Sequence, residues 1–319
     1  MEPPLPPMHP KTPQLIEQLD LRVVDAVKWN LLLCVKKENA GNEPTHVLKF
    51  GTDKRKSDSI AYETRILREV LPQLNSSEFD RLVLPEVISS GESGPLRWVL
   101  TQYISGQPLI HQWSELNFKP NILGGRGIDE EVAAMSVDVL RDLRMVDIAI
   151  LPDFVRRFSF SSWLNDFRHQ SQQLIEMGLM EKSAVDAALS LFGDKNVERY
   201  EGSMFTNGDF YPRNIILLPD GKIAVVDWVG GIDPWEFVAM HAWLLMWGNA
   251  KWQARYMQEI KHHFPVDEQE MQVGLLVRSF DMVWRWKDEP EMNIGFARTQ
   301  MLAYFQQCLD LDYVRQLFS

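Results

Sequence analysis

Residues 206–228 contain the pattern that most constrains how this chain can fold. Two short apolar runs, Asn214–Leu218 and Ile223–Val226, flank the turn sequence Pro219-Asp220-Gly221-Lys222. Proline presets the backbone of such a turn, glycine tolerates a positive φ, and β-branched residues favour strands. The segment is therefore predicted to form an antiparallel β-hairpin.

Three polar residues surround this predicted hairpin. Asp209 and Asn214 precede the first strand, and Asp227 follows the second. Because a hairpin returns the chain to its start, Asn214 and Asp227 are predicted to lie near each other. Mg²⁺ prefers oxygen ligands and often binds one or two carboxylates together with substrate phosphates. Any one of these residues alone is compatible with a plain turn, but the three together indicate phosphoryl transfer, with Asp209 placed to accept a hydroxyl proton.

The segment resembles the catalytic loop of the aminoglycoside phosphotransferase and choline kinase-like family, whose members are relatives of the protein kinases. That loop reads His-Gly-Asp-x-x-x-x-Asn and precedes a hairpin that ends in Asp-Trp or Asp-Phe. This chain has Asn207-Gly208-Asp209 through Asn214, and then Val226-Asp227-Trp228. The resemblance implies Asp209 as catalytic base and Asn214 and Asp227 as Mg²⁺ ligands. Asn207 departs from the usual His, although an Asn side chain can also donate and accept hydrogen bonds.

The resemblance implies an α+β, two-lobed, protein-kinase-like fold. A Pro-rich tail and short helix are expected in residues 1–20, a nucleotide-binding lobe in 21–105, and a catalytic and substrate-binding lobe in 106–319. The N-lobe should be a small antiparallel β-sheet with one helix, Ser57–Leu74, capped by Ser57 or Asp58. Its expected strands are Arg22–Lys28, Trp29–Lys37, Thr45–Phe50, Leu82–Ser89 and Leu96–Tyr103.

The larger C-lobe should be mainly helical, because apolar residues recur there at helical spacing. The expected helices are Ile128–Ile148, Ser161–Met177, Lys182–Phe192, Trp235–Gly248, Lys251–Phe264, Glu268–Trp286 and Glu291–Phe318.

Lys49 stands on the third expected strand, where the family holds a lysine against the nucleotide phosphates. A lysine between large apolar residues needs a partner, because an unpaired buried ammonium is costly. Glu63 on the following helix is the favoured partner, and Glu69 is the alternative.

Adenine is expected at the backbone of a hinge. The residues assigned to it are Gln102, Tyr103 and Ile104, with Val47, Leu100 and Ile216 lining the faces of the ring. The loop between the first two strands, Asp25–Asn30, has no glycine to let its backbone approach phosphates, so Lys28 or Asn30 would contact them instead. This loop favours a relative that binds nucleotide poorly or is inactive.

The phosphate acceptor is less constrained. Candidate substrate residues follow Asp227 and include Asp233 and Glu236, with Trp235, His241 and Trp243 as further candidates. Asp233 also fits a helix N-cap, with Pro234 at the first helical position.

Composition narrows the partners and the compartment. The net charge of −11 argues against nucleic acid and anionic membranes as partners. Two cysteines, no signal peptide and no long uncharged apolar run favour the cytoplasm. The sequence leaves the oligomeric state open.

These features together predict an ATP- and Mg²⁺-dependent phosphotransferase that acts on a hydroxyl of a small molecule of the aminoglycoside or amino-alcohol class. The alternative is a non-catalytic kinase-fold protein that binds a small molecule or a partner. A protein kinase fits less well, because the segment after Asp227 lacks the expected glycine and activation-loop ending.

Overall fold

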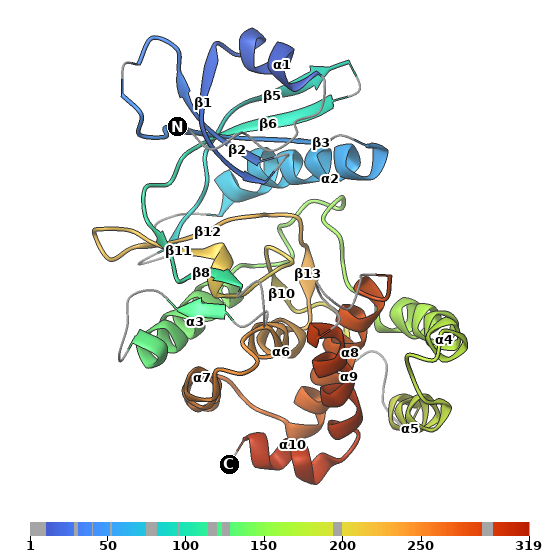
Figure 1. The fold of residues 1–319 in the computed structure, drawn as a ribbon. Helices are drawn as coiled ribbons and strands as arrows, with labels where there is room; N and C mark the ends of the chain where they lie inside the picture. The colour runs from blue at the N-terminus through green and yellow to red at the C-terminus, as the bar shows by residue number, and fades with distance from the viewer. Residues whose placement is uncertain are drawn as a thin grey trace. The chain divides into compact units, whose positions relative to one another are not determined.

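A computed structural model describes residues 11–28, 31–39, 41–51, 53–74, 82–94, 96–113, 120–122, 128–193, 200–288 and 296–318. The Pro-rich residues 1–10 and the loop residues Trp29 and Asn30 lie outside this set. The chain forms two compact units (Figure 1), one of residues 1–106 with 216–229, the other of residues 107–215 with 230–319. The lobe boundaries expected at residues 20 and 105 stay predictions.

The first unit is built on a five-stranded antiparallel sheet in the order β1-β2-β3-β6-β5. Its strands are β1 (Leu21–Lys28), β2 (Leu31–Lys36), β3 (His46–Gly51), β5 (Val87–Ser93) and β6 (Leu96–Gln102). Side chains alternate between the two faces of a strand. Leu48 and Phe50 of β3 therefore face one side, and Val47 and Lys49 face the other.

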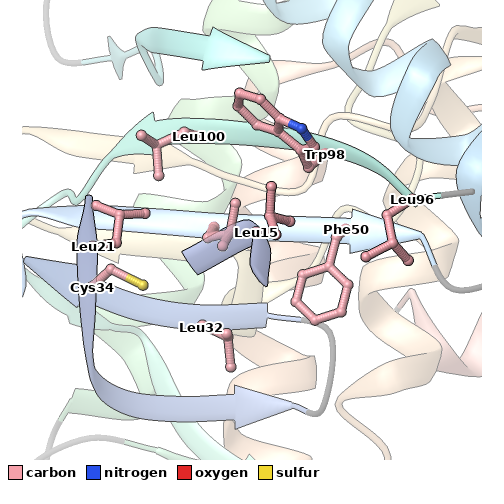
Figure 2. Close-up of a cluster of buried hydrophobic side chains, with 9 residues drawn as sticks. Leu15, Leu21, Leu32, Cys34, Phe50, Leu96, Trp98 and Leu100 are labelled. Carbon is pink, nitrogen blue, oxygen red and sulfur yellow. The ribbon is translucent and has the colours of Figure 1, made fainter. Parts of the chain in front are cut away.

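The face that carries Leu48 and Phe50 holds the core of this unit. Helix α1 (Thr12–Gln18) covers it with Leu15, and Figure 2 shows the side chains that gather beneath the helix. The buried cluster consists of Leu15, Leu21, Leu32, Cys34, Leu48, Phe50, Leu96, Trp98 and Leu100. Full burial of each large apolar side chain stabilises the fold by about 1.5–3 kcal/mol. Cys34 is buried here as a core residue, and burial raises the pKa of its thiol to about 12.

Helix α2 (Lys54–Arg65) packs on β3 and β6. The predicted caps, Ser57 and Asp58, are wrong, because the helix begins one turn earlier and Asp53 Oδ1 accepts from the N–H of Lys56 at 2.8 Å. Gly51 at the end of β3 permits this early start, since a Cβ there would lie 2.3 Å from the backbone nitrogen of Ser57. The predicted helix continues beyond Arg65 as a π-helical turn (Ile66–Val70) and a 3₁₀ turn (Leu71–Gln73).

The strand expected over Leu82–Ser89 is two strands. Pro85 interrupts the run, because proline has no N–H for a sheet ladder. The shorter piece, β4 (Leu82–Val83), pairs in parallel with β12 (Ile223–Val225), and β5 begins only at Val87.

The expected hairpin forms between β11 (Ile215–Leu217) and β12, which are neighbours in one sheet. The N–H of Leu218 donates to the carbonyl of Lys222 at 2.8 Å, and Gly221 takes a φ of +81° in the turn.

The second unit is mainly helical, as predicted. Its long helices are α3 (Ile128–Arg144), α4 (Phe160–Glu176), α5 (Lys182–Gly193), α6 (Trp235–Leu245), α7 (Ala250–His263), α8 (Glu268–Arg285) and α9 (Phe296–Gln307). Every residue of α6 is buried, and α8 packs closely against α6 and α9. Two short strands, β10 (Met204–Phe205) and β13 (Ile232–Asp233), pair antiparallel.

The helix expected over Glu291–Phe318 divides into α9 and α10 (Leu311–Leu317). The break occurs because Asp310 caps a new helix, its Oδ1 accepting from the N–H of Asp312 at 2.9 Å. Among the residues that the structure describes, no helix has the length and apolar character needed to cross a bilayer.

Candidate active site

Lys49 is the centre of a charged cluster in the first unit. Its ammonium donates to Glu63 Oε1 at 2.6 Å and to Asp227 Oδ1 at 2.9 Å. Burial is the largest single effect on the pKa of Lys49 and lowers it, but the two carboxylates together outweigh burial and raise the pKa well above its ordinary value. The lysine is therefore a fixed cation at neutral pH.

Glu63 is the partner of Lys49, as the sequence favoured, and the alternative Glu69 is not. Glu63 is buried on α2, and its carboxylate also accepts a hydrogen bond from the backbone N–H of Trp228. Glu69 lies further along, in the π-helical turn Ile66–Val70, and instead forms an exposed ion pair with Arg65 at 3.0 Å. Only one of the two glutamates faces the sheet.

Asp227 has an unusual backbone. Its φ is +66°, a left-handed conformation that L-residues seldom adopt and that Asp and Asn tolerate best. The next residue, Trp228, is fully buried and donates its indole N–H to the carbonyl of Val225 at 2.8 Å. This bond anchors the chain after β12, while the Asp227 side chain keeps 37% of its surface exposed. Strained residues of this kind cluster at functional sites.

The loop that carries Asp209 belongs to the second unit and follows β10. The N–H of Thr206 donates to the carbonyl of Gly231 at 2.8 Å, which ties the loop to the segment before β13. The contact is very close, because a Cβ on Gly230 would lie 2.1 Å from the backbone nitrogen of Gly208. The backbone of the Asp209 loop is therefore set by glycines on a distant part of the sequence.

The carboxylate of Asp209 is held from two sides. Asn214 Nδ2 donates to Asp209 Oδ2 at 3.2 Å and to the Asp209 carbonyl at 2.8 Å, and His241 Nε2 lies 3.1 Å from Asp209 Oδ1. The Asp209 side chain still exposes 31% of its surface. A carboxylate that is fixed by two donors and open to solvent is suited to accept a proton from a bound hydroxyl.

His241 was one of several substrate candidates in the sequence, and its contact with Asp209 was not predicted. It is a buried histidine on α6. Burial is the main cause that lowers the pKa of His241; nearby Arg278 and Arg285 lower it further, and Asp209 opposes them. The one available signal was a single histidine in a helical run that is apolar after Glu236.

Asn207 is fully buried and makes two long contacts within the loop. Its Nδ2 lies 3.5 Å from the carbonyl of Asp209, and its Oδ1 lies 3.5 Å from the hydroxyl of Thr206. Both distances are long for hydrogen bonds.

Two backbone N–H groups of the expected adenine hinge already have partners. The N–H of Gln102 donates to the carbonyl of Glu86, and that of Tyr103 donates to the carbonyl of Thr45. Contact of Gln102, Tyr103 and Ile104 with an adenine ring stays a prediction.

Two of the residues expected to line the adenine ring have clear positions. Ile216 is partly buried in β11, and its methyl group lies so close to Gly106 that a Cβ there would approach it to 2.6 Å. Leu100 instead packs in the core beneath α1, on the face opposite Lys49, so its expected role is wrong. Trp29, Asn30 and the side chain of Lys28, named for the glycine-free loop, lie outside the described set.

The two substrate candidates have other partners. Asp233 is not the cap of α6, because Pro234 occupies the N-cap position, and its carboxylate pairs with Arg278 at 3.1 Å. Glu236 is buried, which is the main cause that raises its pKa to about 7, and the neighbouring Glu270 raises it further. Their contact with an acceptor stays a prediction.

No protein-family model and no curated protein matches this sequence. Solved structures do match. The gentamicin complex of APH(2″)-IIa is similar with a TM-score of 0.59 and 14% identity over 92% of this chain and 96% of that one. An aminoglycoside phosphotransferase from Alicyclobacillus acidocaldarius gives a TM-score of 0.56 and 14% identity over 99% and 97% of the two chains. A candidate fructosamine-3-kinase from Haemophilus somnus gives 0.56 and 12% over 91% and 95%.

These similarities extend over nearly the whole length of both chains. The protein therefore has the kinase-like α+β fold of aminoglycoside phosphotransferases and of fructosamine kinase, and the expected resemblance is confirmed at the level of fold. At such low identity the likeness establishes the fold, while chemistry has to be argued from the residues.

Proposed function

We propose that this chain is an ATP- and Mg²⁺-dependent phosphotransferase that acts on a hydroxyl of a small molecule. The observation that carries the proposal is Lys49 bound between Glu63 and Asp227, at 2.6 and 2.9 Å. A partly buried cation held by two carboxylates loses much of its hydration, which is costly without a role. Phosphoryl transfer gives it one, because a fixed cation can steady the phosphates of a nucleotide.

The metal ligands would be Asn214 and Asp227. Because the amide nitrogen of Asn214 is directed at Asp209, its amide oxygen is the atom that would face a cation. The described residues contain no group of three or more His, Cys, Asp or Glu side chains suited to hold a metal. Two oxygen ligands supplemented by substrate phosphates fit Mg²⁺, which keeps part of its water shell and would neutralise phosphate charge.

Asp209 would be the base. Both of its carboxylate oxygens are fixed by neighbours, yet part of the side chain is exposed. We infer that it orients the acceptor hydroxyl and takes its proton as the phosphoryl group is transferred.

The class of the phosphate acceptor is supported only by similarity to solved structures. Solved structures with this fold include APH(2″)-IIa with streptomycin and ATP, and APH(4)-Ia with ADP and hygromycin B. These ligands were bound by those proteins. Aminoglycosides and other amino alcohols are therefore the first compounds to screen with this chain. The cytoplasmic location stays a prediction.

A screen for phosphate transfer from ATP to amino alcohols, sugars and aminoglycosides tests the proposal directly. With the best acceptor, Asp209→Ala should lower kcat by at least about 100-fold, since general base catalysis contributes this much or more. Asp220→Ala, in the exposed hairpin turn, is the matched control and should retain activity. Equal activity of Asp209→Ala and wild type, at equal folded fraction, would refute the assigned role.

A non-catalytic kinase-fold protein is the second candidate. The glycine-free loop Asp25–Asn30, and Asn207 in place of the usual His of the family's loop, favour it. Titration with ATP and Mg²⁺ separates the two, because a ligand that binds only the folded state raises the unfolding temperature. No shift at millimolar ATP would favour the non-catalytic protein.

A further inference from the structure

We propose that His241 is a positioning residue for Asp209, an inference that rests on the proposed function. Its Nε2 lies 3.1 Å from Asp209 Oδ1 although the two residues are 32 positions apart in the sequence. An ionised carboxylate only accepts hydrogen bonds, so the imidazole carries its proton on Nε2. His241 thus holds one oxygen of the base while Asn214 holds the other.

The position of His241 argues against a residue that merely fills the core. It is the only polar residue of α6 after the first turn, and burial of a ring nitrogen costs free energy unless it is hydrogen-bonded. An apolar residue would satisfy the same helix without that cost. Asn214 and His241 restrain the two oxygens of the Asp209 carboxylate from different elements, at 3.2 and 3.1 Å.

Burial is the main cause that favours the neutral form of His241; Arg278 and Arg285 add to it, and Asp209 opposes it. Asp209 faces it from the loop, and Arg278, Asp281 and Arg285 face it from α8. Arg278 is itself fixed between Asp233 at 3.1 Å and Asp281 at 3.5 Å. A neutral donor orients the carboxylate of Asp209 without the strong pull of a cation, which would make Asp209 a weaker base. The position of His241 and its neutral state therefore both help to orient the Asp209 carboxylate without weakening it as a base.

Two substitutions separate positioning from packing. His241→Leu removes the donor, and His241→Gln offers an amide nitrogen near the place of Nε2. With the best acceptor, kcat should fall by about 10-fold to 100-fold in His241→Leu, the range seen for residues that orient a functional group. His241→Gln should recover most of that loss, and the KM for ATP should stay within about twofold in both. His169→Leu, an exposed histidine on α4, is the matched control.

The pH profile provides a readout that packing would not change. Protonation of His241 weakens Asp209 as a base, so the acid limb of kcat in wild type should contain a step that is absent in His241→Gln. Retention of wild-type kcat by His241→Leu, or failure of His241→Gln to recover activity at an equal unfolding temperature, would overturn the proposal.

A measurement without turnover distinguishes this inference from the proposed function. The C2 proton of His241, followed by NMR, should titrate at lower pH in Asp209→Asn than in wild type, because the carboxylate that raises the pKa of His241 is gone. An unchanged titration would show that the two residues do not interact, and the positioning role would be refuted with the phosphotransferase intact. If instead the titration shifts and wild type phosphorylates no acceptor, the proposed function fails and the positioning role fails with it.

Discussion

Lys49 and Glu63 form a partly buried ion pair in which the ammonium lies 2.6 Å from the carboxylate, between β3 and α2. The pair links the sheet to the helix on the face opposite the apolar core. Asp227 joins it from the end of the hairpin, at 2.9 Å. Three segments of the first unit are thus connected by one cation.

Removal of either partner should therefore destabilise the protein. Lys49→Met leaves Glu63 buried without its cation, and Glu63→Leu leaves Lys49 with Asp227 alone. Each should lower the free energy of unfolding by about 3–5 kcal/mol, the usual cost of breaking a buried pair. The double variant should lose less than the sum of the two, because neither charge is then left alone. Urea denaturation of the two single variants and the double variant measures these losses.

The matched control is the exposed pair Lys54–Asp58 on the same helix. The corresponding variants, Lys54→Met and Asp58→Leu, should change the denaturation midpoint little, since exposed pairs contribute little. Additive losses at Lys49 and Glu63 would show that the two residues are not energetically coupled.

Asp227→Asn should separate folding from nucleotide binding. Asn tolerates the left-handed backbone of residue 227 and can still accept a bond from Lys49, so the unfolding temperature without ligand should stay close to that of wild type. The added stability from ATP with Mg²⁺ should fall sharply because a carboxylate ligand is lost. Differential scanning fluorimetry with and without Mg²⁺ measures both. Asp220→Asn is the control, and an undiminished Mg²⁺-dependent shift in Asp227→Asn would contradict Asp227 as a metal ligand.

Gly230→Ala should displace the loop that carries Asp209. The added methyl would approach the backbone nitrogen of Gly208 to 2.1 Å, which rigid neighbours cannot accommodate. We expect a loss of about 1–3 kcal/mol in stability, typical of overpacking, together with a loss of kcat. Gly193→Ala is the control, since its Cβ would meet no atom within 4 Å. A Gly230→Ala protein with wild-type stability and activity would show that the loop adjusts freely.

Glu236 should make stability depend on pH. Burial raises its pKa from 4.5 to about 7, so the folded state binds the proton more tightly than the unfolded chain. Stability should therefore fall as pH rises from 4.5 to about 7 and then level off. Glu236→Gln should remove this dependence and gain up to about 3 kcal/mol over wild type above neutral pH. Chemical denaturation at several pH values measures the stability of wild type and of Glu236→Gln. Glu176→Gln, at an exposed position on α4, is the control. A wild type whose stability does not change across this window would contradict the prediction.

Much of the fold could be predicted because its signals are local. The turn at Pro219–Lys222 fixes the hairpin, and helical spacing of apolar residues marks α4, α5 and α7 within one or two residues of their ends. Lys49 could be recognised as a charged residue in an apolar strand. These features follow from backbone preferences and side-chain periodicity, which a few neighbouring residues determine.

Long-range contacts decided the rest. Lys49 and Asp227 are 178 positions apart, and Asp209 and His241 are 32 apart, so no local periodicity could pair them. The same holds for Asp233. Its neighbours in the sequence suggested a helix cap, but its carboxylate pairs with Arg278 on α8.

By itself, then, the sequence determined which segments become strands, turns and helices, and which polar residues are candidates for chemistry. The sequence favoured Glu63 as the partner of Lys49 and left Glu69 as the alternative. The tertiary structure decided between them, and it alone supplied His241 as the partner of Asp209. The physical reason is that backbone conformation depends on adjacent residues, whereas burial and charge pairing depend on which distant surfaces pack together.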